Sequence, residues 1–335
     1  MAQSIYITST EGLSGKSTIV LGVIDALTRS IPRVGVFRSI ARSTSERDYV
    51  LEMLLDHVGV DLDYDECVGV TYDEVRHDPD AALSKIVERF KAVEAKCDAV
   101  VIVGSDFTDV GSTSELGYNA RIAANLGAPV LVVLNGRADQ GDRLGMSVAR
   151  TPEQLGQLMS LALTDISYQR AELFAVITNR ADPTRLREIN AAVHAVVADA
   201  PAADGTREAP VGVWSIPEDV LLVAPAVRDI MLRLDGRLLR GDEELMTREV
   251  LDVVVAGMSL NNVLPRLTDG AIVIVPADRT EVLLGLLLAN SSGTFPSISG
   301  IILNGPFPLP PAVQELMAGL DSSLPIMQAP SLIHI

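Results

Sequence analysis

The feature that most constrains this fold is a glycine-bearing segment, STEGLSGKST, at residues 9–18. It follows a short aliphatic run at residues 5–8 and precedes an apolar stretch with helical spacing. This order predicts a strand, a tight loop and a helix, an arrangement in which backbone N–H groups at a helix N-terminus face an anion. A unit of this kind favours an α/β protein built on a parallel sheet.

The residues of this loop fall into distinct roles. Gly12 and Gly15 let the backbone turn its amides around phosphate oxygens, Lys16 can reach the outer phosphates, and Ser17 offers a hydroxyl to Mg²⁺. The common pattern begins with a glycine, whereas Thr10 stands at that position here. We therefore predict a pocket for a nucleotide or another phosphate-bearing small molecule. The predicted set is completed by Glu11, Leu13, Ser14 and Thr18.

Aliphatic runs alternate with helical stretches over the first two hundred residues or so. Because the runs are apolar throughout rather than alternating with polar residues, they are typical of strands covered by helices on both faces. We predict a doubly wound, mostly parallel sheet whose ligand-binding edge lies at the carboxyl ends of the strands. The predicted strands are residues 5–8, 34–37, 99–103, 129–134, 173–177 and 211–214.

A second, smaller α/β unit is predicted after a break near residues 218–225. The predicted divisions are a P-loop domain at 1–220, a second domain at 221–328 and an atypical tail at 329–335. In the second domain we expect helices at 246–258 and 281–289, and strands at 271–275 and 298–303. The Met-bearing helix at 246–258 has apolar residues at helical spacing, so we expect it in the core or at a subunit interface.

Composition limits the partners that such a chain can have. The 44 acidic residues exceed the 27 basic ones, for a formal net charge of −17, which disfavours a nucleic-acid or anionic-membrane surface. Two cysteines, Cys67 and Cys97, lack metal-ligand spacing and indicate a reducing compartment. With no apolar stretch long enough for a membrane span, we expect a cytoplasmic protein. The acid-rich segment at residues 61–80 predicts a solvated loop.

The loop resembles that of the dethiobiotin-synthetase branch of P-loop proteins, in which threonine also precedes the four variable residues and an acid follows it. Thr10 and Glu11 carry this resemblance. It implies that Lys16 binds phosphates, that Ser17 and Asp48 face magnesium, and that Asn179 in the run FAVITNRADP reads an adenine edge.

Two positions depart from that family. Its lysine at the end of the second strand corresponds to Arg38 in VFRSI, and its glutamate after the third strand corresponds to Val103 in VVIVGSD. An arginine keeps the positive charge but does not readily share a proton, and a valine cannot bind a metal. Asp106, three residues further on, is the candidate replacement ligand for Mg²⁺.

A longer resemblance covers nearly the whole chain. The phrases SIPEDVLLVAPAVRDI, VVVAGMSLNNVLPRL, GAIVIVPADRTEVLLGLLLA and ISGIILNGPFP, in this order, are similar to the N-terminal half of long-form bacterial phosphate acetyltransferase. The second unit resembles the DRTGG domain of those enzymes, with Asp278, Arg279 and Thr280 at its characteristic turn. In that family a C-terminal domain transfers acetyl between coenzyme A and phosphate, and we expect this chain to lack it.

The resemblance implies a regulatory and scaffolding region whose P-loop senses a phosphate ligand, with the acetyltransferase catalytic domain as its partner. We also expect a homo-oligomer. Two alternatives stay open: a stand-alone ATP-dependent ligase of the dethiobiotin type, and a nucleotide-binding module without chemistry. Either would use ATP or another nucleotide, with Mg²⁺ as the accompanying cofactor. The final residues, QAPSLIHI, resemble nothing in the family, which fits a truncation, a frameshift or a divergent relative.

Overall fold

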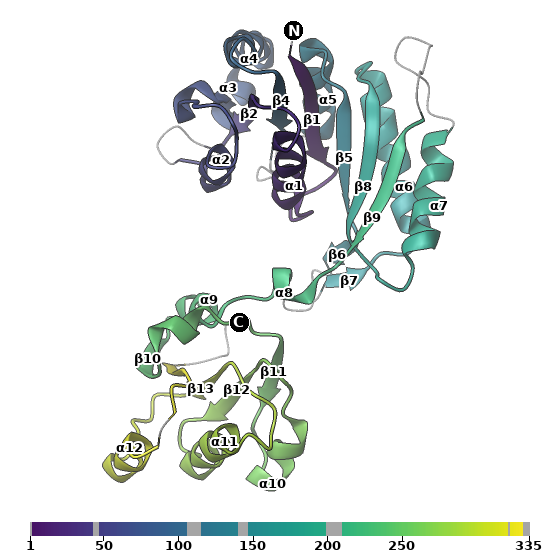
Figure 1. Cartoon of the computed structure of the whole chain (residues 1–335). Helices are drawn as coiled ribbons and strands as arrows, with labels where there is room; N and C mark the ends of the chain where they lie inside the picture. Colours follow the sequence, from purple (N-terminus) through teal and green to yellow (C-terminus); the bar gives the residue numbers. More distant parts are fainter. Residues whose placement is uncertain are drawn as a thin grey trace. The chain divides into compact units, whose positions relative to one another are not determined.

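The computed structural model describes residues 2–42, 47–105, 115–139, 147–198, 210–320 and 322–330. The chain divides into two compact units, Met1–Glu218 and Asp219–Ile335, each with its own sheet (Figure 1). None of the described helices combines the length and the apolar character that a bilayer-spanning segment needs.

The first unit is built on a seven-stranded sheet in which every neighbouring pair is parallel. This confirms the predicted doubly wound fold, with β1 in the middle and its carboxyl end leading into the glycine-bearing loop. In sheet order the strands are β3 (Val68–Thr71), β2 (Val34–Ala41), β4 (Ala99–Val103), β1 (Gln3–Ser9), β5 (Val130–Asn135), β8 (Leu173–Ala181) and β9 (Gly212–Pro217). A short hairpin, β6 (Arg137–Asp139) and β7 (Ser147–Ala149), follows β5.

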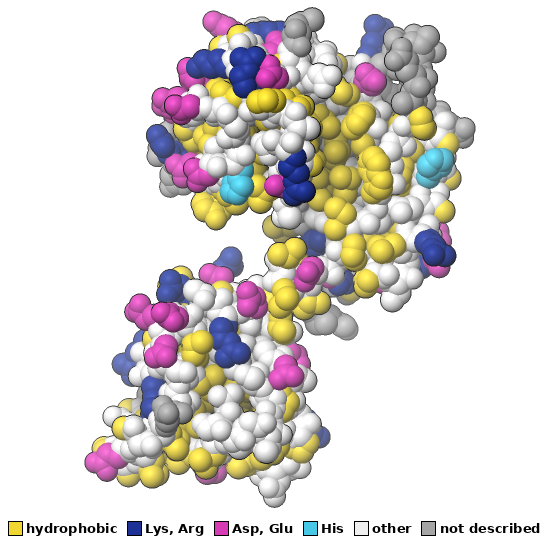
Figure 2. Space-filling model, in the orientation of Figure 1, with side chains coloured by type: hydrophobic (Ala, Val, Ile, Leu, Met, Phe, Trp, Pro, Cys, Tyr) yellow, Lys and Arg dark blue, Asp and Glu magenta, His cyan; other side chains and the backbone are white. Residues whose placement is uncertain are grey.

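Helices cover both faces of this sheet unequally. Along one face α4, α5, α6 and α7 pack in a row, whereas α1 and α2 lie on the other (Figure 1). The described helices leave part of β8 and β9 uncovered on the α1 side, where Trp214 and Ile216 are exposed and apolar side chains gather (Figure 2). The helices are α1 (Lys16–Thr28), α2 (Tyr49–Leu55), α3 (Tyr72–His77), α4 (Pro79–Glu94), α5 (Glu115–Leu126), α6 (Pro152–Tyr168) and α7 (Leu186–Ala198).

The second unit is a five-stranded sheet with a separate core on each face. One core joins α11 to β12 and β13, and the other joins α9 to the opposite side of the same strands. Only β10 runs antiparallel to its neighbour. In sheet order the strands are β10 (Arg237–Arg240), β14 (Ile326–Ala329), β13 (Gly300–Asn304), β12 (Ala271–Pro276) and β11 (Asp252–Val255). The helices are α8 (Val220–Val223), α9 (Val227–Arg233), α10 (Leu260–Val263), α11 (Thr280–Ser292) and α12 (Pro311–Ala318).

The predicted helix at residues 246–258 is wrong. The segment contains β11, an edge strand in which Val253 and Val255 are exposed, preceded by a 3₁₀ turn at Glu243–Thr247. A run of three valines favours the extended conformation, because branching at Cβ restricts the side chain in a helix. The predicted tail at 329–335 overlaps the end of β14, and residues 331–335 lie outside the described residues.

The acid-rich segment at residues 61–80 is not the solvated loop that its charge predicts. It contains a 3₁₀ turn at Tyr64–Glu66, then β3, then α3 and the start of α4. Its acids act mainly at helix ends: Asp63 caps the 3₁₀ turn, Glu74 completes a capping box with Thr71, and Asp78 caps α4. Carboxylates are favoured at such positions because they accept hydrogen bonds from unpaired N–H groups and because their negative charge is attracted to the positive end of the helix dipole.

Candidate phosphate-binding site

The glycine-bearing loop joins β1 to α1, and Gly15 is its pivot. Gly15 has φ 73°, in the left-handed region, and is the N-cap of α1. A Cβ at this position would collide with the side-chain amide of Asn179, whose Nδ2 donates to Ser14 O at 2.9 Å. Both the backbone conformation and the close approach therefore require glycine. Asn179, predicted to read an adenine edge, contacts the loop itself.

Lys16 is buried at the base of the loop, with 5% of its surface exposed. Its ammonium donates to Gly104 O at 2.6 Å and also to Ser105 O. These two carbonyls follow directly after β4, so the lysine ties the start of α1 to the carboxyl end of the neighbouring strand. The cation predicted to meet phosphate is thus held in place by backbone oxygens of its own unit.

Arg38, a further predicted residue, meets Lys16 at the carbonyl of Gly104 and pairs with Asp48, another predicted residue. Arg38 is 3% exposed; its Nη1 donates to Gly104 O at 2.8 Å, and its Nε lies 3.0 Å from Asp48 Oδ2. The other oxygen of Asp48 accepts from Val50 N at 2.9 Å as the N-cap of α2. The structure therefore brings three predicted residues together, with the carboxylate engaged by an arginine and a helix end.

The predicted magnesium ligands were Ser17, Asp48 and Asp106. Ser17 is half-buried in the first turn of α1, and Asp106 lies outside the described residues. Magnesium prefers anionic oxygen ligands, whereas the charge of Asp48 is already balanced by Arg38. Asp48 as placed does not fit that role, and within the described ranges no three His, Cys, Asp or Glu side chains gather as a metal site.

The outer part of the loop carries one ion pair and one unsatisfied hydroxyl. Glu11 pairs with Arg150 through both of its carboxylate oxygens, with 3.0 Å between Nη2 and Oε2. Arg150 also donates to Asn135 O at 3.0 Å, at the end of β5. Thr10 Oγ1 is buried and has no hydrogen-bond partner among the described residues. A buried hydroxyl costs free energy when unpaired, so this atom favours a ligand in the loop.

The other predicted loop residues differ in exposure. Leu13 forms the tip, with φ 56° and 83% of its surface exposed, and its carbonyl accepts from Arg180 Nη1 at 3.4 Å. Ser14 is buried, Gly12 is half-buried, and Thr18 is exposed on α1. Burial lowers the pKa of Arg180 from its ordinary value, with a smaller effect from Arg137 in the same direction.

Sequence reasoning missed the side chains that hold the base of the site. Asn119 in α5 is fully buried; its Oδ1 accepts from Tyr6 OH at 2.7 Å and from Ser105 N at 3.0 Å, and its Nδ2 donates to Ser105 Oγ at 2.7 Å. Burial raises the pKa of the Tyr6 hydroxyl well above its usual value. This network fixes Ser105, whose carbonyl receives Lys16.

Two family models match the chain. One described as an AAA domain matches residues 3–201, and one described as a DRTGG domain matches residues 229–331. Phosphate acetyltransferase of Nitratidesulfovibrio vulgaris is 30% identical over 328 residues, which are 95% of this chain and 44% of that protein. Phosphate acetyltransferase of Synechocystis sp. is 27% identical over 342 residues, covering 100% of this chain and 46% of that protein. The chain thus spans somewhat less than half the length of these relatives.

Solved structures resemble the chain only weakly. Chloroplast FtsY from Physcomitrella patens aligns with a TM-score of 0.37 and 14% identity, covering 60% of this chain and 57% of that one, a likeness too low to carry a functional argument. The AAA-domain match extends over more than half of the chain and includes the whole loop that holds Lys16. The chain therefore belongs to this AAA domain family and carries a DRTGG domain in its second unit.

Proposed function

We propose that this chain is the N-terminal regulatory and scaffolding region of a phosphate acetyltransferase, and that its P-loop binds a nucleotide or another phosphate-bearing small molecule. The observation that carries the first part is the similarity to two such enzymes over 95% and 100% of this chain, within relatives about twice its length. The parent reaction, acetyl transfer between coenzyme A and phosphate, then belongs to the half of those enzymes that this chain does not match.

Three features of the loop support phosphate binding. The amide N–H groups at the start of α1 and the positive end of its dipole face the loop, as in other anion-binding helix N-termini. Lys16 brings a buried positive charge to the same place. The unsatisfied Thr10 hydroxyl is available to donate to an incoming oxygen. A ligand with several phosphoryl oxygens would satisfy all three.

The surroundings of the loop favour binding over turnover. Phosphoryl transfer needs a metal on the phosphates and a residue that positions the nucleophile. Here Asp48 is committed to Arg38 and α2, and an arginine does not exchange a proton near neutral pH. In this proposal the bound ligand acts by stabilising one conformational state of the enzyme over another.

Calorimetric titration of the 335-residue chain with ATP, ADP and inorganic phosphate tests the proposal. We expect a nucleotide to bind and to keep binding when Mg²⁺ is chelated, with no nucleotide hydrolysis and no acetyl phosphate formation. Lys16→Ala should weaken binding at least about tenfold, equivalent to about 1.4 kcal/mol. Lys85→Ala is the matched control, because that lysine is ion-paired with Glu74 on the surface. Unchanged binding by Lys16→Ala, or robust turnover, would contradict the proposal.

A further inference from the structure

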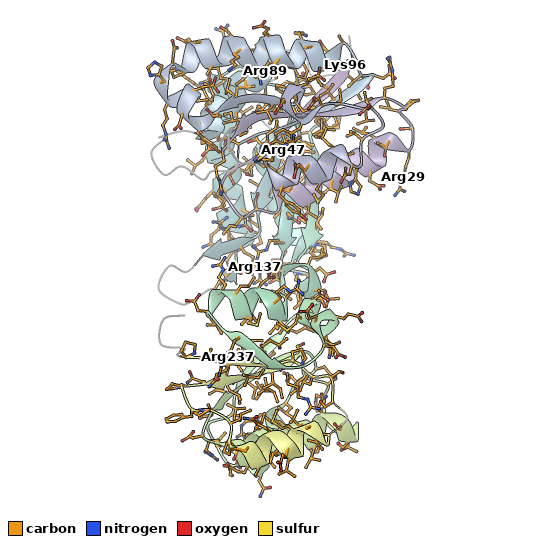
Figure 3. All side chains as sticks on the ribbon, turned by 90° about the vertical axis from the view of Figure 1, so that its left-hand side faces the viewer. Arg29, Arg47, Arg89, Lys96, Arg137 and Arg237 are labelled. Atoms are coloured by element: carbon orange, nitrogen blue, oxygen red, sulfur yellow. The ribbon has the colours of Figure 1, made fainter. Side chains whose placement is uncertain are left out.

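A pocket of about 340 Å³ lies in the second unit, beside β10, the end of β14 and α12. Its apolar wall includes Leu239, Leu309 and Met317, and its polar groups include Arg237 and Arg240. Figure 3 labels Arg237 on this side of the unit, with α12 below it in that view. The volume and the mixture of an apolar wall with a few polar groups are typical of small-molecule sites.

The two arginines of this pocket are held by neutral acceptors. Arg237 Nη2 donates to Gln328 Oε1 at 2.8 Å, and Arg240 Nη2 donates to Leu320 O at 2.7 Å. Neither guanidinium forms an ion pair within the described ranges, although the chain has 17 more acids than bases. By contrast, Arg33 pairs with Asp98 on the surface of the first unit. Two uncompensated cations at one pocket favour an anionic ligand.

Gln328 fixes the position of one of these cations. It is 8% exposed, and its Nε2 donates to Gly305 O at 3.0 Å and to Phe307 O at 2.9 Å. With the amide group held in this way, its oxygen can only face Arg237, so the guanidinium is oriented before any ligand arrives. Less side-chain entropy is then lost on binding.

We propose that this pocket binds a small organic anion whose carboxylate or phosphate group contacts Arg237 and Arg240 and whose compact apolar body contacts Leu239, Leu309 and Met317. Guanidinium groups donate in a planar fork that suits both kinds of oxyanion. The chain would thus carry a second ligand site, built from residues of the DRTGG domain alone and independent of the P-loop.

Calorimetric titration of the full chain with butyrate, butyl phosphate and 1-butanol tests this site. We expect both anions to bind and the alcohol, which keeps the apolar body without the charge, to bind at least about tenfold more weakly. Tighter binding of either anion than of the alcohol supports the site, and the anion that binds more tightly of the two identifies the preferred head group. Equal binding of 1-butanol and butyrate would overturn the proposal.

Substitutions locate the binding. Arg237→Gln and Arg240→Gln should each weaken anion binding at least about fivefold. Arg266→Gln is the matched control, since that exposed arginine also donates to a backbone carbonyl, Asn262 O, but lies outside the pocket lining. Lys16→Ala should leave butyrate binding unchanged, which separates this site from the P-loop. Anion binding that survives both pocket substitutions would overturn the proposal.

A second pair of variants does not depend on the arginines. Ala318 lines the pocket from the exposed end of α12, so Ala318→Trp should fill its mouth and abolish anion binding. Ala312→Trp places the same side chain at an exposed position of the same helix, outside the pocket lining. That variant should bind the anion as tightly as the unchanged protein does. Equal binding by these two variants would count against the site.

Discussion

At the scale of single residues, the loop depends on Gly15 for its shape. We expect Gly15→Ala to lower the free energy of unfolding by about 2 kcal/mol, because alanine is strained at φ 73° and its Cβ collides with Asn179. Gly22→Ala, in the exposed interior of α1 with open space around it, should instead be stabilising by up to about 1 kcal/mol. Urea denaturation of both variants measures the difference, and equal effects would contradict this account.

The buried thiol of Cys67 makes the free energy of unfolding fall as the pH rises in the alkaline range. Burial, assisted by the neighbouring Glu66 carboxylate, raises the pKa of Cys67 to about 12. Above about pH 8.5 the unfolded chain releases this proton while the folded protein keeps it, so the stabilisation, complete at lower pH, is lost as pH rises. The loss approaches about 1.4 kcal/mol per pH unit for this group.

Comparison with Cys67→Ala isolates the contribution of that thiol. The free energy of unfolding, measured with denaturant at pH 8 and at pH 10, should fall more between these two pH values for the unchanged protein than for the variant. This holds whatever the variant's absolute stability. Parallel declines would show that the thiol does not titrate in this range. The native protein should also resist thiol alkylation at pH 8, since little thiolate is present.

How much of the site the sequence could predict depends on the distance between partners along the chain. Lys16 and Ser17 follow from the loop motif itself, and the resemblance adds Arg38 and Asp48, which do lie together. The partners of Glu11 and Ser105 could not be predicted, because Arg150 is 139 residues from Glu11 and Asn119, 14 residues after Ser105, lies in α5 outside any recognised motif. Only the folded sheet brings such side chains together.

At the scale of helices and strands, the strands of five or more residues were predictable, including the edge strand β9, and the strands of three or four residues were not. Central strands such as β4 and β5 are buried on both faces and therefore read as continuous aliphatic runs. β3, β10 and β14 were missed because each is only four residues long. β11 was mistaken for a helix because its three valines stand in a longer stretch, residues 246–258, whose apolar residues have helical spacing.

Asp78 shows how an element boundary is fixed by one side chain. Its carboxylate caps α4 by accepting from Asp80 N at 3.1 Å and Ala81 N at 3.0 Å. We expect Asp78→Ala to destabilise the first unit by about 1 kcal/mol, and Asp78→Asn, which keeps the accepting oxygen, to cost much less. Thermal unfolding of the two variants measures this; similar losses would indicate that charge rather than capping matters.

At the scale of the whole molecule, the two units have separate hydrophobic cores. The large cluster lies within residues 1–218, and the two smaller clusters lie within residues 219–335. Since cooperative unfolding follows the extent of a core, we expect two transitions in differential scanning calorimetry.

Substitutions assign those transitions. Gly15→Ala should lower the midpoint of one transition only, and Leu286→Ala, which removes a fully buried side chain from α11, should lower only the other. A single transition that both variants shift together would contradict independent cores. The sequence predicted a break near residues 218–225 because the last predicted strand of the first sheet, residues 211–214, ends before it. It could not indicate that the second unit has a core on each face of its sheet.

The part of β8 and β9 that the described helices leave uncovered has a practical consequence for spectroscopy. Trp214 is the only tryptophan in the chain, and about half of its surface is exposed on β9. Its indole emission should already be red-shifted and quenched by iodide in the native protein, so intrinsic fluorescence reports little of the burial lost on denaturation. Because this fluorophore belongs to residues 1–218, melting of the DRTGG domain would pass unseen unless a second chromophore were introduced there.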